Sequence, residues 1–424
     1  MRRVEVILTS LLVLAAASNS ADGQSPDIVI QLRVHLGRSQ QAIPADDVVR
    51  PLTAFHLLGA LEKSSPSVEL YPPGLFSRMQ KVPAENEVAW NQVVKSWSEK
   101  AGANVLVGAV PWHHIAANSA LWEPGRRITV SFLSGDTSLH RVIESTVKEW
   151  AQNGNFTFDF GFDPATETYR RWSLDDHVHV ADVRIAFLGK TERISGSEIV
   201  TPGNPAYDGG EYHAGDWSVI GNASRFEVAA NRPSMNFESL KRGIPWDYQR
   251  IILHEFGHAL GFLHEHQNPL GGCDSEIRWE DDGEVGSEDY KPGVYSLLAS
   301  IDAKLFTRKE VDRQLRQFGR LPGQILSVRD PQSIMHYQFP PDWLKKGEAS
   351  QCYVSLNSSL SSSDIQGVKR AYPSPDSSLF ARALEDRLNS LRLIQQLSGD
   401  RPGFLDEIIG NLNDLDAKLR EGAF

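Results

Sequence analysis

The chain has 424 residues, and its 43 Lys and Arg against 54 Asp and Glu give a formal charge of −11. An acidic chain repels phosphate backbones, so this balance disfavours a general nucleic-acid binder. Hydrophobic residues make up 41% of the chain, an ordinary globular composition that disfavours a disordered or collagen-like protein. Two cysteines are too few for a cysteine-rich zinc module or a dense disulfide scaffold.

Residues 1–24 have the pattern of a secretory signal peptide. Arg2 and Arg3 precede an apolar core at residues 6–17, which is too short to span a membrane, and small residues follow it. An uncleaved membrane anchor is the alternative. Because no later segment approaches about 18 consecutive apolar residues, the sequence predicts a secreted or extracellular protein without stable membrane insertion. In a Gram-negative bacterium the protein would be periplasmic.

Three further regions follow the signal peptide. Residues 25–118 alternate like a strand at 28–36 and have helical spacing at 46–63, which predicts a small α/β unit that is either a propeptide or an accessory domain. Residues 119–375 contain the motifs that carry chemistry, and we expect them to form a catalytic domain. Residues 376–424 contain two polar, amphipathic segments, which predict a helical hairpin.

Within residues 119–375, alternating apolar residues predict strands at 127–133, 156–160 and 178–188. Residues 216–221 are short, polar and bounded by Gly, as an edge strand would be. Helical spacing predicts helices that begin after a cap at Asp136 or Thr137 and near Trp246, with further helices at 301–317, 364–372, 380–397 and 404–419.

Residues 254–265 read His-Glu-Phe-Gly-His-Ala-Leu-Gly-Phe-Leu-His-Glu. His254 and His258 are four residues apart, so a helix presents both imidazoles on one face, with Glu255 beside them. Gly261 can adopt a positive φ, which ends the helix and brings His264 back as a third nitrogen donor. Three neutral nitrogen donors with an open fourth position define a catalytic zinc site, where zinc lowers the pKa of bound water. Three satisfied core histidines are the alternative.

A second signature lies downstream, where residues 333–337 read Ser-Ile-Met-His-Tyr. The elongated histidine motif, followed by Met335 in a tight turn, resembles the metzincin class of zinc peptidases. Glu265 directly after the third histidine and Tyr337 two residues after the methionine narrow this resemblance to the astacin family and its bacterial relatives. The resemblance covers residues 120–373.

The resemblance implies an α+β fold with a zincin-like catalytic domain, built from a twisted mixed sheet and an active-site helix. It also implies a role for each residue of the site: His254, His258 and His264 bind one zinc ion, Glu255 is the general base, Met335 forms an apolar floor beneath the metal, and Tyr337 is a fifth ligand that swings away to stabilise the oxyanion.

We expect that two nearby histidines do not bind the metal. In an extended pentapeptide Met335 and Tyr337 share a face, so His336 points away from it. We also expect His266 to lie outside the set of ligands.

These features predict a secreted zinc endopeptidase that binds a protein or peptide substrate along the edge strand near Trp217. The alternative is a catalytically silent zinc-binding adhesion or interaction protein that retains the metzincin fold; the intact Glu255 and Tyr337 favour the enzyme. Export to an oxidising compartment would allow Cys273 and Cys352 to pair, and two buried thiols are the alternative. The oligomeric state is left open.

Overall fold

The computed structural model describes residues 120–226, 228–268, 270–303, 306–317, 329–397 and 403–423. The predicted signal peptide, residues 1–24, and the predicted α/β unit, residues 25–118, lie outside the described residues.

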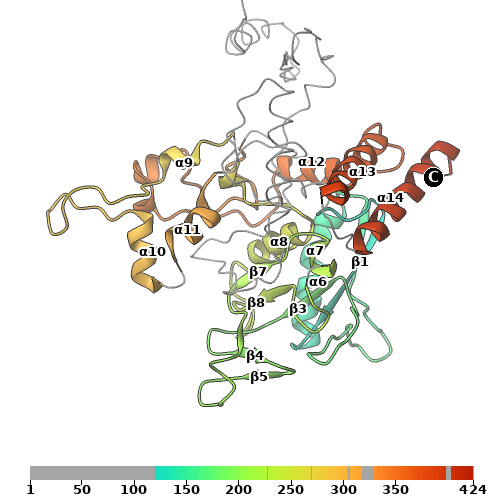
Figure 1. The fold of residues 1–424 in the computed structure, drawn as a ribbon, viewed down its shortest axis with the longest axis horizontal. Helices are drawn as coiled ribbons and strands as arrows, with labels where there is room; N and C mark the ends of the chain where they lie inside the picture. Colours follow the sequence, from blue (N-terminus) through green and yellow to red (C-terminus); the bar gives the residue numbers. More distant parts are fainter. Residues whose placement is uncertain are drawn as a thin grey trace, which may run out of the picture. The chain divides into compact units, whose positions relative to one another are not determined.

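A five-stranded mixed sheet is the larger of the two sheets in the described residues (Figure 1). Its strand order is β2-β1-β3-β8-β7, in which β7 runs antiparallel to β8 and the other neighbours pair in parallel. The mixed sheet with its helices confirms the predicted α+β fold. The strands are β1 (Arg126–Phe132), β2 (Phe156–Asp159), β3 (Val183–Ala186), β7 (Asp216–Ser218) and β8 (Met235–Phe237).

Two strands differ in detail from their predictions. The strand predicted at 178–188 is reduced to β3, because just before it the Asp182 carboxylate accepts the Thr129 N–H at 2.9 Å in place of a backbone partner. β7 lies at the sheet edge, as predicted. All three of its residues are nevertheless buried, because β7 packs against helix α8.

Helix α6 (Thr137–Ala151) begins at the predicted cap, where the Asp136 carboxylate accepts the Leu139 N–H at 2.8 Å. Its buried stripe packs against α8 (Tyr248–Ala259), and Trp150 Nε1 donates to the Leu253 carbonyl at 2.8 Å. This contact fixes α8, the helix that carries the histidine motif, against α6.

The single helix predicted at 301–317 is wrong. Two shorter helices, α10 (Val294–Asp302) and α11 (Arg308–Leu315), occupy this part of the chain. Phe306 lies between them and is buried in the same apolar cluster as Val294 and Val311. A break at this point allows both helices to face one cluster, which a continuous helix would not do.

Several short elements were not predicted, because a strand of two or three residues is too short to show a period of two. They are the three-stranded sheet of β4 (Arg193–Ser195), β5 (Glu198–Val200) and β6 (Glu211–Tyr212), and the four-residue helices α7 (Ala223–Phe226) and α9 (Cys273–Glu276). Three-residue 3₁₀ helices lie at Glu265–Gln267, Pro341–Trp343 and Gly347–Ala349.

The C-terminal helices are α12 (Ser362–Ala371), α13 (Phe380–Leu397) and α14 (Gly403–Glu421), and α13 and α14 lie side by side (Figure 1). Arg387 of α13 is buried and donates hydrogen bonds to the carbonyls of Trp122, at 2.6 Å, and Ala371. α13 is therefore tied to the chain that leads into β1. None of the described helices is long and apolar enough to cross a bilayer.

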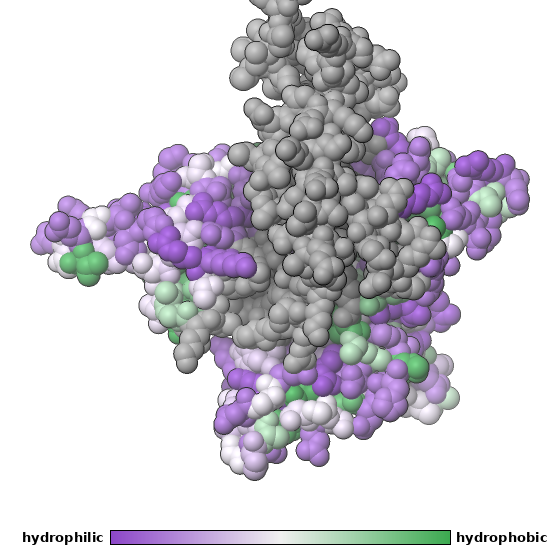
Figure 2. All heavy atoms as spheres, in the orientation of Figure 1, coloured by the Kyte–Doolittle hydropathy of each residue, from purple (hydrophilic) through white to green (hydrophobic). Residues whose placement is uncertain are grey.

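Cys273 and Cys352 form a disulfide, and both are fully buried in the apolar cluster beside α10 and α11. The loop between α9 and α10 carries most of the acidic residues that follow Cys273, and its residues 280–289 are exposed. Hydrophilic side chains dominate this loop in the view of Figure 2. It is a solvated loop, as a run of charged residues usually is.

Candidate metal centre

The histidine motif lies at the C-terminal end of α8 and in the turn that follows. His254, Glu255 and His258 are on the helix, and all three are buried. Gly261 has a φ of +93°, and its N–H donates to the His258 carbonyl at 2.7 Å. The chain turns sharply there, as the glycine predicts. The turn returns His264 to the face of the helix that carries the other two histidines.

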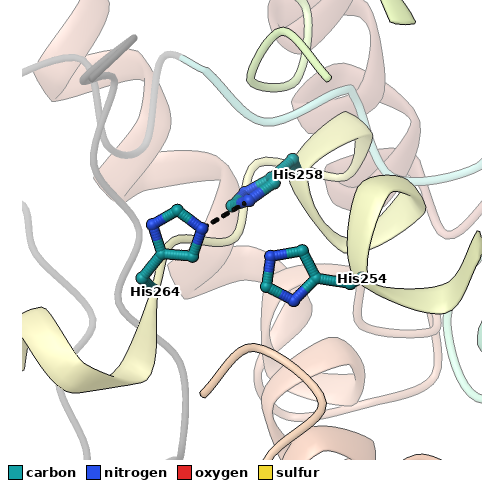
Figure 3. Close-up of side chains that lie close together, drawn as sticks. All are labelled: His254, His258 and His264. Atoms are coloured by element: carbon teal, nitrogen blue, oxygen red, sulfur yellow. Dashed lines mark hydrogen bonds between the residues drawn. The ribbon is translucent and has the colours of Figure 1, made fainter. Parts of the chain in front are cut away.

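The three histidines converge on one point (Figure 3). Their candidate ligand atoms lie within 4.8 Å of one another, and Nε2 of His258 is 3.0 Å from Nε2 of His264. None of the three side chains is more than 3% exposed. The structure thus brings together the three residues that the spacing of the motif singled out.

Two of these rings are oriented by backbone carbonyls. His254 Nδ1 donates to the Ile334 carbonyl at 2.8 Å, and His258 Nδ1 donates to the Phe262 carbonyl at 2.7 Å. A carbonyl only accepts, so Nδ1 carries the proton in both neutral rings and Nε2 keeps its lone pair. A metal-binding histidine usually donates its other ring N–H to such a carbonyl or to a carboxylate, which fixes the orientation of the ring.

The donor types and the His258–His264 pair suit a zinc ion. Tetrahedral zinc with Zn–N bonds of about 2.0–2.1 Å places neighbouring ligand nitrogens about 3.3 Å apart. The 3.0 Å between the His258 and His264 nitrogens is close to this spacing. Three neutral imidazoles suit zinc, and three protein ligands leave a coordination position for water or substrate.

The second signature lies directly against the histidines. Met335 is fully buried, and a Cβ atom at Gly257 would lie only 2.4 Å from its sulfur, so Met335 packs on the glycine between the two helical histidines. The ring of Tyr337 lies 4.0 Å from the ring of His264 and 6.0 Å from that of His254, between centroids. Tyr337 is only 3% exposed, so its ring contact with His264 is shielded from solvent.

Glu265 is also fully buried, and it ties the third histidine to the methionine turn. Its N–H donates to the Met335 carbonyl at 2.9 Å, and its Oε1 accepts hydrogen bonds from Asn268 Nδ2 and the Asp330 N–H, both at 2.9 Å. Burial raises the pKa of Glu265 well above its usual range. Glu265 thus connects the segment after His264 with Asp330 and Met335.

His336 and His266 both lie outside the group of three converging histidines. His336 Nδ1 donates to the Tyr337 carbonyl at 2.7 Å, and its Nε2 accepts from Arg329 Nη1 at 3.1 Å. Burial lowers the pKa of His336 to about 3. His266 stacks on Tyr337, with 4.3 Å between ring centroids and 22° between ring planes.

Sequence reasoning missed the carboxylate that holds the methionine turn. Asp364 of α12 accepts the Ser333 hydroxyl at 2.7 Å and the N–H groups of Ile334, at 2.9 Å, and Ser361, at 2.8 Å. The only signal in the sequence is the Ser-x-x-Asp capping box, which Ser361 and Asp364 form at the start of α12.

A cavity of about 430 Å³ opens beside His254 and reaches Tyr337. Asp247, which immediately precedes α8, and Arg250 of α8 line it and pair with each other at 3.0 Å. Residues that follow Cys352 form another part of its wall.

Comparison with known proteins finds only limited similarity in sequence and structure. No protein-family model and no curated protein matches the chain. The solved structure of myroilysin is 24% identical over 60% of this chain and 97% of its own, with a TM-score of 0.40. High choriolytic enzyme 1, a hatching enzyme zinc-protease from Oryzias latipes (Medaka fish), is 17% identical over 59% and 94%, with a TM-score of 0.32.

The three histidines, the buried Glu255 and the methionine turn with Tyr337 make this chain resemble the astacin-like metzincins. The TM-scores are below 0.5, so this resemblance rests on the motifs and on the geometry of the site.

Proposed function

We propose that the protein is an exported zinc-dependent endopeptidase of the astacin-like type. The observation that carries the proposal is the convergence of three buried histidine rings, with Glu255 next to His254 on the same helix. His254, His258 and His264 would hold one zinc ion, with Tyr337 as a further ligand. When bound, zinc lowers the pKa of a coordinated water and polarises the carbonyl to be cleaved.

The chain's own residues supply the remaining chemistry. Glu255 accepts the proton of the attacking water and returns it to the leaving amine as a general base and then a general acid. Its complete burial excludes bulk water from this proton transfer. Tyr337 donates a hydrogen bond to the oxyanion of the tetrahedral intermediate. Met335 fills the space beneath the histidines with an apolar side chain.

The substrate is proposed to be a protein or peptide in extended form. β7 is the edge strand of the sheet and packs against α8, so backbone pairing along β7 would place a peptide beside the site. The cavity of about 430 Å³ next to His254 would receive one of its side chains. Under this proposal residues 119–375 are the catalytic domain and residues 376–424 a C-terminal helical unit.

The test is digestion of a mixed peptide library by the purified, zinc-loaded protein and its Glu255→Gln variant. General acid–base groups contribute roughly 100- to 10,000-fold, so we expect a loss of kcat in this range with zinc content unchanged. Glu276→Gln is the matched control, because Glu276 binds Ser350 and Lys346 outside the site, and it should keep wild-type kcat. Equal cleavage by the Glu255→Gln variant, or no cleavage by the zinc-loaded wild type, would reject the proposal.

A further inference from the structure

Tyr337 packs against a histidine that the proposed chemistry does not use. The rings of Tyr337 and His266 are stacked, with 4.3 Å between centroids and 22° between planes. The same tyrosine ring lies 4.0 Å from His264. His266 is 0% exposed, so its contact with Tyr337 is dry and close. This geometry gives His266 a defined neighbour in the site without making it a metal ligand.

His266 is itself held in place from the side of α11. The next residue, Gln267, donates through Nε2 to the carbonyls of Gln314 and Arg316, both at 3.1 Å. Phe339 meets the His266 ring edge-on, with 5.0 Å between centroids. The imidazole therefore cannot turn away from Tyr337 without losing several contacts.

We propose that His266 is a positioning residue for Tyr337: its fixed imidazole face supports the phenol ring at the place beside His264 from which the tyrosine acts. This inference rests on the proposed function only for the role of Tyr337. Without the imidazole, the Tyr337 ring would border a void and sample more orientations, because a buried ring keeps one orientation only where its neighbours fill the space around it. Since Tyr337 acts on the oxyanion, the cost would fall on kcat and leave KM almost unchanged.

A double-mutant cycle separates this role from general damage to the site. Because a stacked aromatic pair contributes favourable free energy, we expect His266→Ala to lower kcat roughly 3- to 10-fold. In a Tyr337→Phe background, which keeps the ring but lacks the hydroxyl, the same change should lower kcat less than about 2-fold. His266→Phe restores a flat ring and should keep more kcat than His266→Ala. Equal losses in both backgrounds would overturn the proposal.

His140→Ala is the matched control. His140 is also a buried, stacked histidine, with 3.8 Å between its centroid and that of Phe132, and its ring donates to the Ser134 carbonyl. Its partners are not residues of the site. Truncation at position 140 should therefore change kcat equally in the wild-type and Tyr337→Phe backgrounds.

A second readout does not depend on activity. Fluorine NMR of 3-fluorotyrosine placed at position 337 reports the surroundings of that ring, in the presence or absence of zinc. His266→Ala should shift or broaden the resonance, and His140→Ala should leave it unchanged. An unchanged resonance in His266→Ala would overturn this inference even in an inactive protein. Inactivity of the zinc-loaded wild type would instead reject the proposed function and leave the ring contact standing.

Discussion

Asp364 and Ile334, thirty residues apart in sequence, are joined by a hydrogen bond of 2.9 Å from the Ile334 N–H to the Asp364 carboxylate. The carbonyl of Ile334 in turn accepts the Nδ1 proton of His254 at 2.8 Å. A carboxylate on α12 therefore holds the backbone that orients a proposed zinc ligand on α8. Its other partners are also donors, the Ser333 hydroxyl and the Ser361 N–H, so position 364 requires two accepting oxygens.

Asp364→Asn should weaken both the fold and the metal site. The amide nitrogen of Asn cannot accept, so at least one buried donor loses its partner, at a cost of about 1–3 kcal/mol in the free energy of unfolding. Loss of an orienting group around a metal ligand also lowers metal affinity, by roughly 10-fold or more. Urea unfolding of the metal-free protein and zinc competition with a chelator measure the two effects.

Asp136→Asn is the control for that substitution. Asp136 caps α6, and Asn caps a helix about as well as Asp, so stability should change by less than about 0.5 kcal/mol. An Asp364→Asn protein with wild-type stability and zinc affinity would show that the methionine turn does not depend on this carboxylate.

The contrast between His258 and Asp364 shows what the sequence could predict. The histidine set follows from local spacing, since a helix and one glycine at position 261 determine where three side chains point. Asp364 looks from sequence like an ordinary capping residue, because its reach to Ile334 depends on tertiary packing between distant segments. Long elements with a strong period, such as α13 at 380–397, were predicted with their observed bounds.

Replacement of Cys273 and Cys352 by Ser should destabilise the protein by about 2–4 kcal/mol, because the disulfide closes a long loop in the unfolded chain. The two residues are 79 apart in sequence. Tyr353 and the residues that follow line the cavity beside His254, so we also expect KM to rise while zinc remains bound. Urea unfolding and steady-state kinetics measure these effects. Reductant should affect the wild type and not the double variant; equal sensitivity of both would contradict the prediction.

Arg387→Met should lower the free energy of unfolding by about 2–3 kcal/mol, because two buried carbonyls lose a charged donor. Those carbonyls belong to Trp122 and Ala371. Arg420→Met on α14 is the matched control, since Arg420 is exposed and pairs only with Asp416 among the described residues, so its loss should cost less than about 0.5 kcal/mol. Denaturant unfolding compares the two variants, and similar small losses would mean that α13 contributes little to the stability of the protein.

His140 should make the protein sensitive to acid. Burial against Phe132 lowers the pKa of His140 from 6.5 to about 4. Between these values the unfolded chain binds a proton that the folded protein does not, so the free energy of unfolding falls as pH decreases through this window, by up to about 3 kcal/mol. The stabilising contribution of neutral His140 is fully present above about pH 6.5 and is lost below about pH 4.

Urea unfolding at about pH 7 and about pH 5 measures this loss. A chelator should be present throughout, so that proton-driven release of metal does not contribute. His140→Phe keeps the stacked ring without a titrating group and should lose less stability between the two pH values. An identical loss in both proteins would exclude His140 as the cause.

The packing of Met335 on Gly257 has a consequence for how this sequence can diverge. Glycine inside a helix costs about 1 kcal/mol relative to alanine, yet even an alanine Cβ here would lie 2.4 Å from the Met335 sulfur and 3.2 Å from Trp150 Cζ2. A residue larger than glycine at position 257 would therefore displace the Met335 side chain from its place against α8. In related sequences, the residue at this position should thus vary with the side-chain packing at position 335, which lies 78 residues further along the chain.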